Sequence, residues 1–200
     1  MGLTFTNTAA TTAAVTNRYV TTADMKVGAY TLANTTPAWA GAAFVTVTHT
    51  QVGGVTDDLG TIVVVGKDLS GQTRTETITP LDGTVATGVV PFRSITSITG
   101  VDWVIDTGND TIVVGVAAGN LAVGSGGSLG GVLVNNSVAA AIVISDAGRT
   151  IMTVPASQAA GTYYNLHNVD FSGYLKVATT STNDVTVFHS GTLPTSYAMA

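Results

Sequence analysis

Residues 60–80 read GTIVVVGKDLSGQTRTETITP and form the clearest hairpin pattern in the chain. Ile62 to Val65 is apolar on both faces, as in a central strand that is covered on both sides. After a short turn, residues 72–79 alternate, with threonines on one side and Glu76 among the residues on the other. We therefore predict an antiparallel hairpin whose second strand faces solvent, with Glu76 exposed on it and its charges discouraging edge aggregation.

The alternation continues on both sides of this hairpin. In Phe44–Thr50 the side chains of Val45, Val47 and His49 share one face, as in a half-buried strand. Pro91 lacks a backbone N–H, so residues 85–98 should contain a bulge or an edge strand. Residues 101–105 and 111–116 read as a second hairpin. Further strands are predicted at 132–135, 138–145, 150–154, 169–178 and 184–189.

Composition agrees with this pattern over the 200 residues. Thr is the commonest residue, Val follows, and Glu76 is the only glutamate, so the usual residues of helix surfaces are scarce. Thr and Val are branched at Cβ and suit a pleated sheet, and the 23 glycines indicate many tight turns. We predict an all-β fold of two small antiparallel β-sandwich or barrel-like domains with an extended N-terminal arm.

Two segments without periodicity suggest the domain boundaries. Residues 1–25 are rich in Thr, Ala and Asn, and residues 124–131, GSGGSLGG, have the composition of a flexible linker. The predicted organisation is an arm at 1–25, a β-sandwich at 26–123, a linker at 124–131, a second small β domain at 132–192 and a tail at 193–200.

The N-terminal arm carries few large apolar side chains. Phe5, Tyr19 and Val20 are large enough to anchor in grooves of a neighbouring molecule, and the Thr-rich backbone is able to add a strand to an exposed sheet edge. Residues 1–25 are therefore expected to form an intermolecular arm, the alternative being a mobile tail.

Charge and cysteine content exclude several classes of function. With no cysteine there is no disulfide framework, thiol nucleophile or cysteine-based metal site. Seven Lys and Arg are spread singly over a chain of net charge −5, which argues against direct nucleic-acid binding. No apolar run approaches the roughly 18 residues of a membrane span. The N-terminus does not read as a secretory signal, so synthesis and folding in a cytoplasm are expected.

Candidate chemical sites are few. The three histidines, His49, His167 and His189, show no metal-ligand spacing, and no G-x-S-x-G motif occurs, so neither catalysis nor a cofactor is expected. Asp106, Asn109 and Asp110 form the one weak metal candidate, a calcium loop, although the same residues are typical of an ordinary turn. Trp39, Trp103, Tyr163, Tyr164 and Tyr174 are the aromatic candidates for a sugar-binding platform. The favoured alternative is that Trp103 is a core residue and that Tyr163 and Tyr164 point to opposite faces at the start of a strand.

The hairpin GTIVVVGKDLSGQTRTETITPLDGT, the following FRSITSITGVDW…TGNDTIVVGV and the closing VDFSGYLKVATTSTNDVTVFHSG resemble segments of small all-β structural proteins of tailed-bacteriophage virions. The resemblance covers roughly residues 44–190 and carries no reactive group. It implies a non-catalytic virion protein, foremost a capsid decoration or stabilising protein on the outer head surface, or else a tail, tail-fibre or baseplate component with a glycan-binding module. The implied partners are the major capsid protein or other virion proteins and further copies of the chain, without nucleic acid or membrane.

Overall fold

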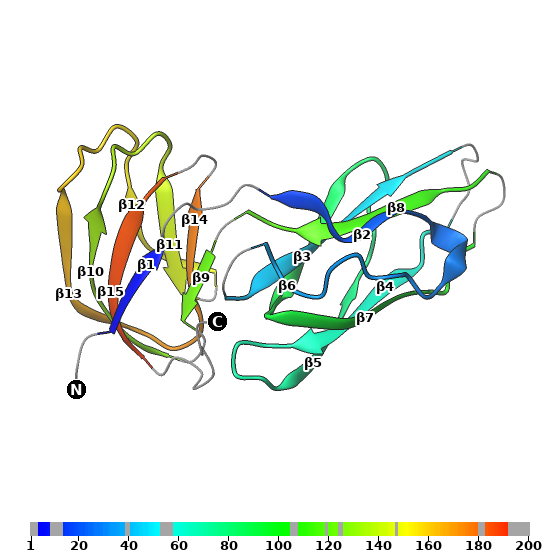
Figure 1. Ribbon diagram of the computed structural model, residues 1–200, viewed down its shortest axis with the longest axis horizontal. Coiled ribbons are helices and arrows are strands. Elements are labelled where there is room, and N and C mark those ends of the chain that lie inside the picture. The colour runs from blue at the N-terminus through cyan, green and yellow to red at the C-terminus, as the bar shows by residue number, and fades with distance from the viewer. Residues whose placement is uncertain are drawn as a thin grey trace. The chain divides into compact units, whose positions relative to one another are not determined.

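The computed structural model describes residues 4–8, 14–38, 41–52, 58–104, 108–118, 120–123, 126–146, 148–179 and 183–191. The chain divides into two compact units (Figure 1). We call Ala14–Ala117 the inserted unit and Met1–Ala13 together with Ala118–Ala200 the split unit. Within the described residues there is no α-helix, so the predicted all-β fold of sandwich-like domains is confirmed.

The described residues of the inserted unit form seven strands in two antiparallel sheets. In chain order they are β2 (Val15–Asp24), β3 (Ala43–Thr50), β4 (Thr61–Lys67), β5 (Thr73–Ile78), β6 (Val85–Phe92), β7 (Ser94–Val101) and β8 (Thr111–Val116). One sheet has the order β2-β8-β3-β6 and the other the order β5-β4-β7. A 3₁₀ turn, η1 (Met25–Val27), follows β2.

An irregular segment after η1 extends the second sheet beside β7. Tyr30 N donates to Ile98 O at 3.0 Å, Gly100 N donates to Gly28 O, and Ile95 N donates to Thr35 O at 2.7 Å. Ala29 also forms an isolated bridge with Thr99. Residues 28–35 thus occupy the place of an eighth strand without regular strand geometry.

In the part of the split unit that the structure describes there are eight strands. They are β1 (Thr4–Thr8), β9 (Asn120–Val123), β10 (Gly127–Val134), β11 (Ile142–Asp146), β12 (Arg149–Val154), β13 (Tyr163–Phe171), β14 (Leu175–Thr179) and β15 (Val185–Gly191). Its two four-stranded sheets have the orders β1-β15-β10-β13 and β12-β11-β14-β9.

Both units share one pairing scheme when residues 28–35 are counted as a strand. In each, the first strand pairs with the last, the second with the seventh, the third with the sixth and the fourth with the fifth. This is the order of a long hairpin rolled into two sheets, the jelly roll. The inserted unit therefore lies in the chain between the first strand, β1, and the second strand, β9, of the split unit.

The core of the inserted unit follows from strand alternation. Val45, Val47 and His49 lie inward on β3, as predicted, and pair in register with inward residues of β8. Apolar side chains of β4 and β7 close the core from the other sheet. The members with at most 1% exposure are Tyr19, Val20, Val45, Val47, Ile62, Val64, Phe92, Ile98, Ile112, Val114 and Val116.

The split unit has its own separate core. Val132 pairs with Val187 and Val134 with Val185 across β10 and β15, and all four side chains are fully buried. The opposite sheet contributes further buried side chains: Ile142, Ile144, Val154, Leu175 and Val177.

The predicted linker at 124–131 was wrong, because the described residues from 127 onward form β10, a strand with neighbours on both sides. The unit boundary lies instead at 117/118. Gly131 is required in this strand because a Cβ there would lie 2.5 Å from the Tyr163 hydroxyl oxygen and 2.6 Å from the backbone oxygen of Tyr164. Glycine here indicates close packing between strands, not a flexible connection.

The predicted N-terminal arm was also wrong for residues 15–24. These residues form β2, which pairs with β8 of the same unit, and Tyr19 and Val20 are fully buried in its core. The predicted hairpin of 101–105 with 111–116 does not form either, because β7 pairs with β4 whereas β8 pairs with β2 and β3. Pro91 does lie on an edge strand, β6, beside a register break.

Candidate functional site

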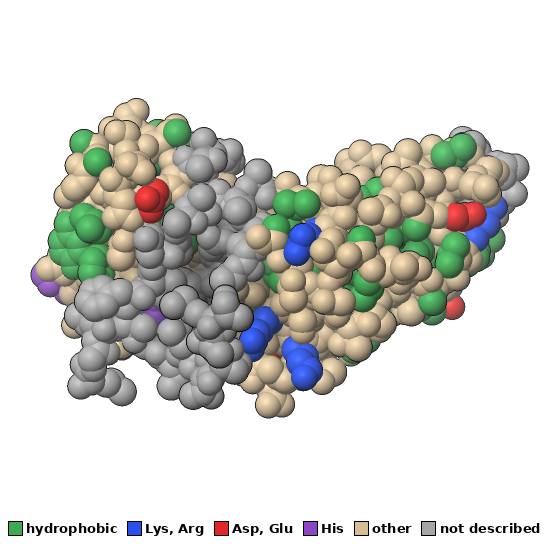
Figure 2. Space-filling model, viewed as in Figure 1, with side chains coloured by type: hydrophobic (Ala, Val, Ile, Leu, Met, Phe, Trp, Pro, Cys, Tyr) green, Lys and Arg blue, Asp and Glu red, His purple; other side chains and the backbone are tan. Residues whose placement is uncertain are grey.

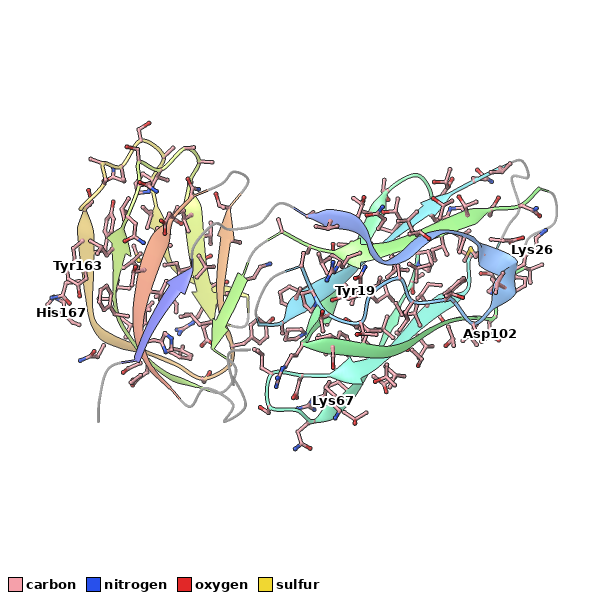
Figure 3. The ribbon with its side chains drawn as sticks, in the orientation of Figure 1. Tyr19, Lys26, Lys67, Asp102, Tyr163 and His167 are labelled. Atoms are coloured by element: carbon pink, nitrogen blue, oxygen red, sulfur yellow. The ribbon has the colours of Figure 1, made fainter. Side chains whose placement is uncertain are left out.

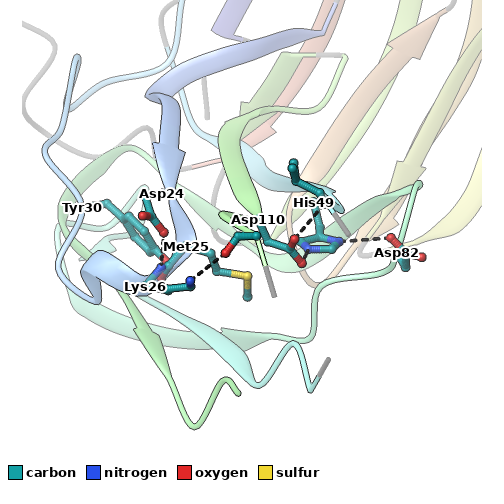
Figure 4. Close-up of polar contacts among 9 residues, drawn as sticks. Asp24, Met25, Lys26, Tyr30, His49, Asp82 and Asp110 are labelled. Carbon is teal, nitrogen blue, oxygen red and sulfur yellow. Dashed lines mark hydrogen bonds and ion pairs between the residues drawn. The ribbon is translucent and has the colours of Figure 1, made fainter. Parts of the chain in front are cut away.

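A histidine lies between two aspartates in the inserted unit (Figure 4). His49 is the last inward residue of β3, Asp110 comes just before β8, and Asp82 lies in the turn before β6. His49 Nε2 lies 2.8 Å from Asp110 Oδ2, and His49 Nδ1 lies 3.2 Å from Asp82 Oδ1. The side chains of His49 and Asp110 are fully buried, whereas that of Asp82 is 59% exposed.

Both ring nitrogens of His49 are occupied by this arrangement. Each of the two ring nitrogens faces one carboxylate oxygen. General acid–base chemistry needs a ring nitrogen that faces a bound molecule, and a fully buried imidazole held on both sides offers none. The geometry therefore supports a role in fixing β3, β8 and the turn at Asp82 to one another.

Asp110 also organises the neighbouring backbone. Its Oδ1 accepts a hydrogen bond from Val52 N at 2.8 Å, and its carbonyl oxygen accepts one from Met25 N at 2.9 Å. Tyr30 closes the same region, since its hydroxyl donates to Met25 O at 2.9 Å. Burial raises the pKa of Tyr30 to about 12, with a smaller contribution from the charge of Asp24.

The calcium loop considered for Asp106, Asn109 and Asp110 is not assembled by the described residues. Asn109 Oδ1 lies 3.3 Å from Lys26 Nζ, which also donates to Gly108 O at 2.7 Å, so a cation already binds these oxygens. The Asp110 carboxylate accepts from His49 and Val52, and Asp106 lies outside the described residues. In the described part of the chain, no group of three or more potential metal-ligating side chains occurs.

Glu76 is buried, not exposed as its alternation on β5 suggested. It is 8% exposed, and its Oε1 accepts hydrogen bonds from Val89 N and, at 3.1 Å, Val90 N. A Cβ on Gly88 would overlap Glu76 Oε2, so the glycine makes room for the carboxylate. Glu76 thus joins the edge of one sheet to the edge of the other. The sequence feature that could have indicated this burial is Gly88, whose lack of a side chain leaves room for Glu76, the only glutamate.

A groove runs beside Glu76 between β5 and β6, with a volume of about 450 Å³. We call this the β5/β6 groove; its lining comprises residues 76–79, 81 and 85–89. Three apolar side chains on it face solvent: Leu81 and Val85 are each 50% exposed and Val89 is 75% exposed. Exposed apolar side chains gathered on a sheet edge are typical of an interaction surface.

The three residues predicted as intermolecular anchors, Phe5, Tyr19 and Val20, are divided between the two units. Tyr19 and Val20 are core residues of their own unit and are therefore not available to a neighbouring molecule. Burial raises the pKa of the Tyr19 hydroxyl, an effect slightly opposed by Arg18. Phe5 lies in β1, where its backbone is opposite Phe188 of β15.

The aromatic residues do not form one platform. Tyr163 is 51% exposed and makes an edge-to-face contact with Phe188, with ring centroids 5.7 Å apart, whereas Tyr164 packs against the core. Figure 3 shows Tyr163 and His167 on β13, the edge strand of the first sheet of the split unit. Trp103 and Tyr174 are half-buried, and Trp39 lies outside the described residues.

Charged side chains are few and scattered among uncharged ones on the face shown in Figure 2. Among the described residues, none of the helical structure is long or apolar enough to cross a membrane. Neither protein-family models, nor curated protein sequences, nor solved structures match this chain.

Proposed function

We propose that the chain is a non-catalytic structural protein of a tailed-bacteriophage virion that decorates and stabilises the outer surface of the head. The observation that carries the proposal is the pair of jelly-roll units with an exposed apolar sheet edge, Leu81, Val85 and Val89, in one of them. The jelly roll is a fold used by viral capsid proteins and by lectins. The sequence resemblance to virion proteins, which rests on hairpin motifs alone, supports the same class.

The polar clusters agree with a structural role. His49 and Asp110 bind each other, and Glu76 binds the backbone of β6, so these acidic and basic groups serve the fold itself. A protein that is present in many copies and performs no turnover needs stable units and contact surfaces. The proposed partner is the major capsid protein, which would contact the β5/β6 groove, and the proposed location is the virion.

The test is the composition of purified particles. We expect the chain in intact virions at a copy number that matches the capsid lattice, and labelled antibody against it should bind heads. Absence from purified particles would contradict a virion role altogether.

A variant pair tests the contact surface. Val89→Lys puts a charge on the β5/β6 groove at a side chain that is 75% exposed, and Val27→Lys does the same at a 63% exposed valine outside it. We expect Val89→Lys to abolish attachment to heads that lack the protein and Val27→Lys to leave attachment unchanged. Equal attachment of both variants would remove the groove from the interface.

The second candidate is a tail, tail-fibre or baseplate component with a glycan-binding module. It is favoured by the exposed ring of Tyr163 with Phe188 beside it, because aromatic faces stack on sugars. This candidate predicts that the antibody labels tails only and that each particle holds a few copies. It also predicts glycan binding that Tyr163→Ala abolishes. These results would favour it over head decoration.

A further inference from the structure

The two units have different side chains at the matching edge between their sheets. In each unit three residues of the sixth strand lie opposite one residue of the third, and this bulge begins at Gly88 in β6 and at Leu166 in β13. On the other edge strand, Glu76 of β5 matches Met152 of β12, since each pairs with the central apolar residue of the fourth strand. Met152 and Leu166 both pack against the core of the split unit. The inserted unit thus has a carboxylate and a glycine where the split unit has two apolar side chains.

The β5/β6 groove lies at this edge of the inserted unit. Gly88 and Glu76 both line it, and a side chain on Gly88 would occupy the place of the Glu76 carboxylate. Val89, the second residue of the bulge, is exposed to solvent together with Leu81 and Val85. Because apolar side chains at the matching positions of the split unit pack on its core, the jelly roll itself does not require an open groove here. A groove with exposed apolar walls is typical of a binding surface.

Only one oxygen of the Glu76 carboxylate binds the backbone of β6. Oε1 accepts hydrogen bonds from Val89 N and Val90 N. Oε2 is buried and has no hydrogen-bond partner among the described residues. A buried acceptor without a donor costs free energy, more so for a charged group, so a donor supplied by a bound molecule would recover that cost. Glu76 is also the only ionisable side chain in the described lining of the groove, and a cation is therefore the donor that suits it best.

We propose that the β5/β6 groove binds an extended segment of a partner protein through a lysine whose ammonium group pairs with Glu76 Oε2. A single free oxygen suits the compact charge of an ammonium, and the aliphatic stem of the lysine would lie along Val85 and Val89. β5 and β6 are both edge strands, so the backbone of an extended segment can pair with either edge. The inference rests on the proposed function only in taking this groove as the contact surface.

Peptide binding to the full chain tests the lysine contact. The probe is a capped nine-residue peptide of alternating threonine and valine with lysine at its centre, and the control peptide has norleucine there. Because Oε2 is closed to solvent, binding requires a small shift of the carboxylate, which the amide signals of Val89 and Val90 report in NMR spectra. We expect the lysine peptide to shift both signals and to bind about tenfold more tightly than the norleucine peptide.

Two variants of the chain test whether Glu76 is the group that binds the lysine. Glu76→Gln keeps an acceptor oxygen for Val89 N and Val90 N but removes the charge, so it should retain the fold and lose the preference for the lysine peptide. Asp102→Asn removes a charge from an exposed position outside the groove and should leave the preference unchanged. Equal binding of the two peptides to the wild type, or a preference that survives in Glu76→Gln, would overturn the proposal. Failure of both peptides to bind would overturn it too, and would leave water as the partner of Oε2.

Attachment to particles separates this proposal from the proposed function. If the chain belongs to the virion, Glu76→Gln should attach to heads that lack the protein several-fold more weakly than Asp102→Asn does. Equal attachment of the two variants would overturn the lysine contact and leave the virion role standing. Absence of the chain from virions would remove the virion role and leave the peptide result unchanged, because the peptide test uses no particle.

Discussion

The two units have the same strand pairing but different side chains at matching positions. His49 opposite Ile112 in the inserted unit corresponds to Val134 opposite Val185 in the split unit, because each pair begins the buried ladder between the third and last strands. Asp110 and Asn183 both lie two residues before the first buried residue of the last strand, and both are buried. A histidine–aspartate pair is thus matched by a valine and an asparagine.

Asn183 performs the backbone role of Asp110 without a charge. Its Oδ1 accepts from Ala139 N at 2.8 Å, as Asp110 Oδ1 accepts from Val52 N, and its Nδ2 donates to Ala140 O at 2.9 Å. The fold therefore requires an acceptor at this position and does not require an ionisable pair. The His49–Asp110 pair is an addition specific to the inserted unit.

A second matched position concerns the bulge on the sixth strand. In both units the register between third and sixth strands breaks where two extra residues enter the sixth strand, β6 or β13. In β6 the freed N–H groups bind Glu76 from β5, whereas in β13 His167 N binds Asn165 Oδ1 at 3.0 Å. The residue matching Glu76 is Met152, since each pairs with the central apolar residue of the fourth strand.

The largest effect is expected from leaving His49 without its buried partner. Asp110→Ala should lower the free energy of unfolding of the inserted unit by about 3 to 5 kcal/mol, because it leaves the buried His49 ring and the N–H of Val52 without their hydrogen-bond partner. The double variant His49→Val, Asp110→Asn, which copies the split unit, should recover most of this loss. Hydrogen exchange followed by mass spectrometry resolves the two units, and a double variant as unstable as Asp110→Ala would show that the units are not equivalent here.

Removal of the Glu76 carboxylate is expected to have the next largest effect. Glu76→Met leaves Val89 N and Val90 N without their acceptor and should destabilise the inserted unit by about 2 kcal/mol. Met152→Leu in the split unit is the control and should cost less than about 1.5 kcal/mol. Chemical denaturation of both variants provides the measurement; a loss no greater for Glu76→Met than for the control would mean that the bulge does not depend on Glu76.

Acid should destabilise the split unit through a buried histidine. Burial lowers the pKa of His189 below its usual value near 6.5, so the unfolded chain binds a proton more readily than the folded chain. Stability is therefore retained above that pH and falls as the pH drops through and below it. His189→Val introduces the residue found at the matching position of the inserted unit. His189 lies opposite Leu129 of β10, as Val116 lies opposite Val45 of β3. In a pH series of thermal unfolding, the melting temperature of this variant should fall less steeply toward acid pH than that of the wild type. An equally steep fall would assign the acid sensitivity to other groups.

The smallest expected effect concerns the inserted unit at high pH. Tyr30→Phe removes the hydrogen bond to Met25 O and should cost about 1 kcal/mol at neutral pH. Because the pKa of Tyr30 is raised to about 12, the folded state favours the neutral phenol, and stability falls as pH rises above 10. The variant should lose less stability than the wild type between pH 10 and 12. Unfolding of both proteins is measured by circular dichroism. Equal losses of stability would assign the high-pH effect to Tyr19 instead of Tyr30.

The sequence alone predicted the strands best where alternation is strict. Val45, Val47 and His49 of β3 were correctly assigned to one common face, and residues 85–98 to a bulge or an edge strand, because local pattern determines which residues share a face. Tyr19 and Val20 were not recognised as core residues, since they are adjacent buried residues in a strand whose register breaks twice. Local alternation fails at such irregularities.

The candidate site and the domain division were less accessible to sequence reasoning. His49, Asp82 and Asp110 come together only through sheet closure, and nothing in their spacing along the chain marks the contact. The insertion between β1 and β9 depends on a pairing of the first strand with the last, which is the least local contact of a jelly roll. The glycine-rich sequence of β10 was interpreted as a linker because composition does not distinguish close packing from flexibility.

The split arrangement also sets an order of events during synthesis. Among the described strands, β1 leaves the ribosome before the others, and β15, its partner, leaves after them. The inserted unit is complete at residue 117, and at 5 to 20 residues per second the further residues up to β15 take about 4 to 15 s. Each nascent chain therefore displays a folded inserted unit and an unpaired β1 at the same time. During that interval β1 waits for the strand that completes its ladder, because β15 of its own chain has not yet been made.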